Sequence, residues 1–136
     1  MYMLRKFYYT WENLDSDVQK IIKHIKDNNW EIDAIYAIPR GGLVLGTMLS
    51  YILNVPLINV RKGFKNILVV DDLSDSGKTL NSIPNIKLYK TITLHIKEKT
   101  TFIPDFYCKQ FGQNHWIVYC WEPKDSKTER DGTLQN

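Results

Sequence analysis

Apolar residues recur in the first third of the chain at two different spacings. In residues 14–29 they follow the three-and-four spacing of one helical face, with Asp15 or Ser16 expected as the N-cap. These apolar residues are Val18, Ile21, Ile22 and Ile25. The next run, 34–38, is continuously apolar and ends at Pro39, which predicts a strand buried on both faces. An amphipathic helix followed by a buried strand is therefore expected.

Helices and strands are expected to alternate through the middle of the chain. A helix is predicted at 43–53 and strands are predicted at 56–60, 67–70 and 91–96, with a further strand near Phe106. A helix that begins near Gly77 should end before Pro84, because proline has no amide hydrogen for the helical ladder. This alternation predicts an α/β domain with a mainly parallel sheet flanked by helices. Ligands of such sheets bind at the carboxyl ends of the strands.

Length and composition limit how the chain is organised and what it binds. Its 136 residues suffice for one domain, expected at 1–123 and followed by a polar tail at 124–136. A net charge of +3 without a run of like charges argues against nucleic-acid binding, and no stretch reaches the roughly 18 apolar residues of a membrane span. Cys108 and Cys120 are too few for a disulfide framework. We expect a cytoplasmic protein with reduced thiols that binds neither nucleic acid nor membranes.

The most informative stretch of the chain is 67–79, which reads ILVVDDLSDSGKT. Four apolar residues precede Asp71 and Asp72, and small residues then lead toward a helix. Carboxylates accept hydrogen bonds from sugar hydroxyls, and a small-residue turn before a helix exposes backbone amides to a phosphate. The pattern is therefore typical of a sugar-phosphate site. An acidic turn that only caps the next helix is the alternative.

The end of this stretch, Gly77-Lys78-Thr79, also imitates the end of a P-loop. A P-loop requires a further glycine five residues before Gly77, and this chain has Asp72 there. Because a carboxylate at that position would repel a triphosphate, a nucleoside-triphosphate site is disfavoured.

A second glycine-containing turn, Pro39-Arg40-Gly41-Gly42, ends the first buried strand. An arginine beside two glycines offers a bidentate cation and exposed amides, which suit pyrophosphate. Taken alone, a plain turn is the alternative. Both glycine-containing turns follow buried strands, so both are expected at the carboxyl edge of the sheet.

These two motifs resemble those of a known enzyme family. The stretch 67–79 is similar to the PRPP-binding signature of type I phosphoribosyltransferases, although Ser74 and Lys78 depart from the commonest pattern. The stretch 37–50, AIPRGGLVLGTMLS, resembles the pyrophosphate loop and following helix of bacterial xanthine-guanine and hypoxanthine phosphoribosyltransferases. Tyr9-Thr10-Trp11 echoes an aromatic residue and a tryptophan near the start of those enzymes. The resemblance spans roughly 9–122 and implies the type I phosphoribosyltransferase fold.

The resemblance implies a role for each residue of the two turns. It assigns the ribose hydroxyls and Mg²⁺ to Asp71 and Asp72, and acceptance of the proton on the base to Asp75. The implied 5-phosphate ligands are Asp75, Ser76, Gly77, Lys78 and Thr79. The implied pyrophosphate ligands are Arg40, Gly41 and Gly42.

Two later segments are implied to recognise the base. Lys97 lies where these enzymes carry the lysine that contacts the purine oxygen. In the segment 116–122 Trp116 is implied to stack on the purine and Ile117 to read its edge. Glu122 is implied to join the two aspartates as a metal ligand. The three histidines are expected to be structural; they are His24, His95 and His115.

The implied function is purine salvage, in which ribose 5-phosphate passes from PRPP to guanine, xanthine or hypoxanthine in a homodimer or homotetramer. One feature departs from the family: only residues 61–66 separate two predicted strands, where these enzymes usually insert a long mobile loop over PRPP. A non-catalytic or weakly catalytic PRPP- or nucleotide-binding regulatory protein therefore stays open as an alternative. A pyrimidine or orotate enzyme is a further alternative, which Lys97 and Trp116 disfavour.

Overall fold

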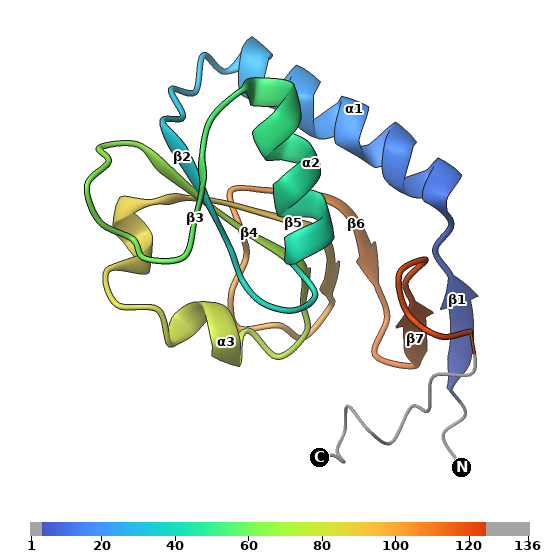
Figure 1. Cartoon of the computed structure of the whole chain (residues 1–136). Coiled ribbons are helices and arrows are strands. Elements are labelled where there is room, and N and C mark those ends of the chain that lie inside the picture. Colours follow the sequence, from blue (N-terminus) through green and yellow to red (C-terminus); the bar gives the residue numbers. More distant parts are fainter. Residues whose placement is uncertain (1–3, 125–136) are drawn as a thin grey trace.

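Two parallel sheets organise the computed structural model of the chain, which describes residues 4–124 (Figure 1). The larger sheet has five strands in the order β3-β2-β4-β5-β6, and every neighbouring pair is parallel. Its strands are β2 (Ala34–Ala37), β3 (Leu57–Ile58), β4 (Ile67–Ser74), β5 (Lys90–Lys97) and β6 (Phe106–Phe111). The smaller sheet pairs β1 (Arg5–Tyr8) with β7 (His115–Val118). The expected α/β fold with a mainly parallel sheet is confirmed.

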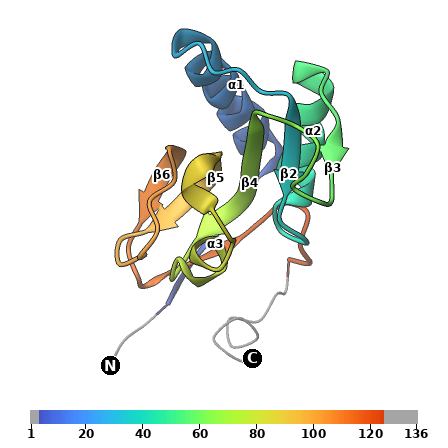
Figure 2. The same cartoon turned by 90° about the vertical axis from the view of Figure 1, so that its left-hand side faces the viewer.

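Helices cover both faces of the larger sheet (Figure 2). On one face lie α1 (Trp11–Asp27) and α2 (Leu43–Leu53), and on the other lie α3 (Lys78–Asn81) and the 3-10 helix η1 (Ile86–Leu88). Successive residues of β4 feed opposite cores: Leu68 packs with α1 and α2, whereas Val69 packs with Leu80 and Ile86. Because both faces of β4 are buried, its apolar run is continuous rather than alternating.

The first helix begins earlier than its apolar spacing suggests, and the expected caps Asp15 and Ser16 are wrong. Thr10 is the N-cap: its Oγ1 accepts a hydrogen bond from the Asn13 amide at 3.0 Å. The Asn13 Oδ1 in turn accepts from the Thr10 amide at 3.0 Å, which completes a capping box. The first turn of α1 carries polar residues on its exposed side, so the apolar period becomes visible only from Leu14.

The connection between β3 and β4 is short, as expected, although β3 is itself shorter than predicted. Residues 59–66 form this connection. Near its start the Arg61 guanidinium lies 4.8 Å from the centroid of the Tyr36 ring. At its end the Asn66 amide and side-chain nitrogen both donate to Asp33 Oδ2 at 3.0 Å. The connection is therefore held against the sheet at both ends.

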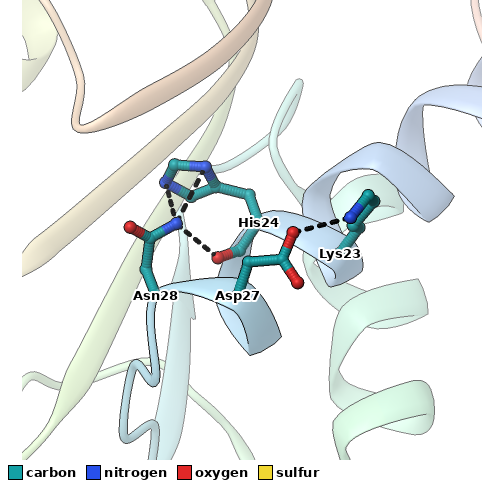
Figure 3. Close-up of polar contacts among 4 residues, drawn as sticks. All are labelled: Lys23, His24, Asp27 and Asn28. Atoms are coloured by element: carbon teal, nitrogen blue, oxygen red, sulfur yellow. Dashed lines mark hydrogen bonds and ion pairs between the residues drawn. The ribbon is translucent and has the colours of Figure 1, made fainter.

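His24 closes the end of α1, where polar contacts join neighbouring turns of the helix (Figure 3). Asn28 Nδ2 donates to the His24 carbonyl at 2.9 Å, and Lys23 donates to Asp27 at 2.7 Å. The His24 ring stacks on Phe106, the first residue of β6, with centroids 4.2 Å apart. His24 thus lies at the amino edge of the sheet, opposite the strand ends that carry the two motifs, and has a structural role.

Three further expectations concern free cysteines, the absence of a membrane span and a polar C-terminal tail. Cys108 and Cys120 are free, and burial raises the pKa of the Cys108 thiol to about 12. Within residues 4–124 no helix combines the length and the apolar character needed to cross a membrane. The predicted tail at 124–136 lies outside the described residues except for Lys124.

Replacing Thr10 with alanine is expected to lower the free energy of unfolding by about 1 kcal/mol, because it leaves a helical amide without its cap. Urea denaturation followed by circular dichroism measures this loss. Ser16→Ala is the matched control, since Ser16 is exposed within α1, and it should change the free energy by less than about 0.5 kcal/mol. Equal losses at the two positions would contradict the assignment of the cap.

Candidate functional site

The two glycine-containing turns meet at the carboxyl edge of the sheet. Ala37 of β2 is paired with Val70 of β4, so the turn after β2 runs beside the acidic end of β4. A Cβ added at Gly41 would collide with the carboxylate of Asp72, and one added at Gly42 would lie 2.6 Å from the Val70 carbonyl oxygen. Only glycine allows the main chain of this turn to approach the acidic pair so closely.

The turn after β4 is shaped by a second segment of chain. Gly77 has a φ of +89°, and a Cβ there would lie 2.6 Å from the Phe102 amide nitrogen. The Ser76 carbonyl oxygen accepts from the Thr101 amide at 2.9 Å and from the Thr101 hydroxyl at 2.7 Å. The conformation of the turn is thereby set by the loop that follows β5.

The same loop explains the unusual serine in the motif. Ser74 is buried, and its hydroxyl donates to the Phe102 carbonyl oxygen at 2.8 Å and lies 2.8 Å from the Thr100 hydroxyl. The Ser74 hydroxyl therefore anchors the loop that follows β5.

A cavity of about 70 Å³ opens beside this turn and is lined by Asp71 and residues 73–80. It holds all five candidate 5-phosphate ligands along its wall. A cavity of this size has room for several water molecules or for one small tetrahedral anion. The wall combines small residues with one cation, Lys78, and two carboxylates, Asp71 and Asp75. The small residues and the lysine suit a phosphate group.

Asp71 and Asp72 both have pKa values above the usual value for an aspartate. Asp71 is buried, and burial raises its pKa, although hydrogen bonds from Asp72 oppose the shift; one is the Asp72 amide donating to Asp71 Oδ1 at 2.9 Å. The pKa of Asp72 lies well above its usual value because of burial first and then because of the Asp71 carboxylate. Two neighbouring carboxylates that both resist ionisation would be relieved by a bound cation.

The third expected metal ligand, Glu122, does not form a three-carboxylate metal site with Asp71 and Asp72 in the described part of the chain. Its Oε1 accepts from the Tyr119 amide at 2.9 Å, and its charge contributes to the raised pKa of Asp72. Among residues 4–124 no three His, Cys, Asp or Glu side chains come close enough together to hold a metal ion. Mg²⁺ bound with a phosphorylated ligand needs only one or two carboxylates, because water and phosphate oxygens supply the rest. Asp71 and Asp72 fit that role.

The base-side candidates also lie together. Lys97, the last residue of β5, is buried, and its Nζ donates to the His115 carbonyl oxygen at 2.7 Å. This contact places the lysine against the start of β7, beside Trp116 and Ile117. The indole Nε1 of Trp116 is buried and has no hydrogen-bond partner among the described residues. A lysine ammonium has three donors, so Lys97 retains donors for a ligand.

Comparisons with known proteins agree with this layout. No protein-family model matches the chain. A xanthine-guanine phosphoribosyltransferase of Chromohalobacter salexigens is 25% identical over 87% of the chain and 85% of its own length. The crystal structure of a purine phosphoribosyltransferase from Pyrococcus horikoshii superimposes with a TM-score of 0.77 at 28% identity, covering 90% of this chain and 97% of the other.

The chain resembles the type I phosphoribosyltransferases. It is a homologue of enzymes that transfer a pentosyl group, and it spans nearly their whole length. A hypothetical protein from Neisseria gonorrhoeae, determined with bound ppGpp, shares the fold with a TM-score of 0.74 at 23% identity over 92% of this chain and 93% of the other.

Two residues next to this phosphoribosyltransferase-like site were not expected from the sequence to contribute to it. Tyr119 and His95 are buried, and the Tyr119 hydroxyl lies 2.9 Å from His95 Nδ1 and 3.4 Å from the main-chain oxygen of Asp72. Burial lowers the pKa of His95 to about 4, while burial and the two aspartates raise the pKa of Tyr119. Tyr119 lies within the segment 116–122 and His95 lies two residues before Lys97, but neither was assigned a role in the site.

Asp72→Asn is expected to stabilise the fold at pH 7 by on the order of 1 kcal/mol, because it removes a poorly solvated charge beside Asp71. The folded-state pKa of Asp72 is raised above its unfolded value of 3.8, so the wild type loses stability as pH rises through this range. The advantage of the variant should therefore be small near pH 4 and grow toward pH 7.

Urea denaturation at several pH values measures this difference. The exposed residue Asp15 provides the control variant Asp15→Asn, which should show no such growth. An Asp72→Asn protein that is less stable than the wild type at pH 7 would refute the electrostatic account.

Proposed function

We propose that the chain is a purine phosphoribosyltransferase that transfers ribose 5-phosphate from PRPP to a 6-oxopurine with release of pyrophosphate. The observation that carries the proposal is the order of groups along the carboxyl edge of the sheet. The pyrophosphate-type turn touches Asp72 on one side, and the phosphate-sized cavity begins at Asp71 on the other. PRPP has the same order: a ribose with pyrophosphate on C1 and phosphate on C5.

In this proposal the two turns bind the ends of PRPP and the carboxylates bind its middle. The amide of Gly41, with the exposed Arg40, faces the pyrophosphate as negative charge grows on it. The Gly42 amide donates to the Ile38 carbonyl oxygen at 2.8 Å, so Gly42 shapes the turn instead of binding the ligand through its amide. Asp71 and Asp72 accept hydrogen bonds from the ribose hydroxyls. Residues 75–79 enclose the 5-phosphate. Mg²⁺, when bound with PRPP, adds positive charge at the leaving group.

The chemical step exchanges one bond at C1 of the ribose for another. The bond from C1 to the pyrophosphate oxygen breaks, a purine ring nitrogen forms the new bond, and the proton of that nitrogen passes to Asp75. Asp75 is exposed at the wall of the phosphate cavity, so it reaches the substrate side without a burial cost. Lys97 donates to the 6-oxo group, Trp116 stacks on the ring and the main chain of Ile117 reads its edge. Purine salvage in a cytoplasmic homodimer or homotetramer is part of this proposal.

A second candidate function is binding of PRPP or a nucleotide without efficient transfer. The short connection 59–66 favours this second function. It is held against Tyr36 and Asp33, so it does not provide a long mobile loop that could close over PRPP. Incubation with Mg²⁺, PRPP and a panel of bases separates the two functions when pyrophosphate and nucleotide are measured together. Stoichiometric formation of both products with one base supports the transferase, whereas binding without product supports the regulatory protein.

PRPP binding is expected to require Mg²⁺, because an unshielded acidic pair repels a polyanion, and both carboxylates, because they hold the Mg²⁺ and accept the ribose hydroxyls. Asp71→Asn and Asp72→Asn should each weaken binding at least about tenfold, a loss of 1.4 kcal/mol, in calorimetry with Mg²⁺ present. Asp15→Asn, on the outer surface of α1, should leave the affinity unchanged. Undiminished affinity in both site variants, with native circular dichroism spectra, would exclude this binding mode.

Choice of base is expected to depend on Lys97, because an ammonium donates to a 6-oxo group and finds no acceptor in a 6-amino group. Adenine should be a poor substrate, and Lys97→Ala should cost about 1.5–3 kcal/mol in kcat/KM for the preferred oxopurine. Lys99→Ala, at an exposed lysine two residues away, is the control. Equal rates with adenine and guanine in the wild type would show that Lys97 does not select the base.

A further inference from the structure

Tyr119 connects two halves of the site that no strand ladder joins. Residues 115–118 form β7, which pairs with β1 and not with the five-stranded sheet. The base-side segment therefore has no main-chain pairing with β4, which carries Asp71 and Asp72. The Tyr119 side chain spans this gap: it follows β7 directly, and its hydroxyl reaches the Asp72 main-chain oxygen at 3.4 Å.

A second, shorter hydrogen bond holds the hydroxyl in place. His95 Nδ1 lies 2.9 Å from the Tyr119 oxygen, and both side chains are buried. A phenol carries one proton, so both contacts are satisfied together only when His95 donates to Tyr119 and Tyr119 donates to Asp72. His95 in turn belongs to β5, two residues before Lys97.

The rest of the base-side segment is tied to the same residue. The Tyr119 amide donates to Glu122 Oε1 at 2.9 Å, and the Glu122 amide donates to the Tyr119 carbonyl oxygen at 2.9 Å. The Trp121 ring stacks on the Tyr119 ring with centroids 4.7 Å apart. A displacement of Tyr119 would thus move the segment from Trp116 to Glu122 relative to the acidic pair.

We propose that Tyr119 is a positioning residue whose hydroxyl, oriented by His95, sets the distance between the base-side segment and the ribose-binding end of β4. This inference rests on the proposed transferase function. The attacking nitrogen and C1 must come within roughly 3–3.5 Å in line, and a misplacement of about 1 Å can cost on the order of a hundredfold in rate. Loss of the hydroxyl should therefore impair transfer while leaving in place the PRPP ligands on β4 and in the turns after β2 and β4.

Tyr9 offers a matched control within the same aromatic cluster. Its ring lies 5.5 Å from that of Tyr119 and 4.9 Å from that of His95, and it is equally buried. Its hydroxyl, however, donates to Asp17 of α1 at 2.7 Å, away from the acidic pair. Tyr9→Phe and Tyr119→Phe therefore each remove one buried hydroxyl from one cluster, and only the second removes the contact with Asp72.

The experiment compares both variants with the wild type in steady-state transfer, PRPP calorimetry and thermal unfolding. Tyr119→Phe is expected to lower kcat at least tenfold with the PRPP dissociation constant within twofold of the wild type. Tyr9→Phe is expected to keep kcat within twofold of the wild type, even if it lowers the melting temperature as much as Tyr119→Phe does. His95→Leu, which removes the group that orients the hydroxyl, should reproduce the kcat loss and provides the test if Tyr119→Phe does not fold.

The outcomes separate this inference from the function on which it rests. An active wild type with an unchanged kcat in Tyr119→Phe, or with equal kcat losses in Tyr119→Phe and Tyr9→Phe, overturns the positioning role and leaves the transferase standing. A wild type that neither binds PRPP nor forms nucleotide with any base overturns the transferase, and the positioning role falls with it.

Discussion

Burial of two neighbouring carboxylates in the second half of β4 is the constraint around which the site is built. Asp71 and Asp72 are held where water solvates them poorly, and each has a raised pKa. The strand that carries them is buried on both faces, so the unfavourable charge is offset by apolar packing along 67–70. Gly41 brings main chain against the Asp72 carboxylate, and Gly42 brings it against the main chain of Val70 and Asp71. The fold thus loses stability at buried charges that a cation or a hydroxyl-bearing ligand would stabilise. Functional sites often lower the stability of a fold in this way.

Local pattern was enough to predict the elements that carry the two glycine-containing turns. The apolar run 43–53 became α2 with those bounds, because Asn54 adopts a left-handed conformation with a φ of 54° that ends the helix. Strand β4 was predicted to stop at Val70, where polarity begins, and that end is wrong. The strand continues to Ser74, because pairing of Asp71 with Thr93 and of Leu73 with His95 covers its polar half. Tertiary pairing here overrides what side-chain polarity indicates.

The base side was much less accessible to sequence reasoning. The resemblance drew attention to the segment 116–122, but neither β7 nor its pairing with β1 followed from local periodicity. Both strands are four residues long and lie at opposite ends of the described chain (Figure 1). Tyr119 and His95 belong to different strand regions, and only the folded chain brings their polar atoms together. Such contacts depend on topology rather than on a motif.

The pairing of β1 with β7 also has a consequence for how the protein is made. Arg5 is matched with His115 and Tyr8 with Val118, so β1 must wait for β7 to be synthesised before it can pair. Strands β2 to β5, with the acidic end of β4, can assemble from residues 34–97 well before that partner is synthesised. Closing so long a loop is slow compared with local contacts. During synthesis, β4 with its two carboxylates can therefore fold before β7 is available to pair with β1.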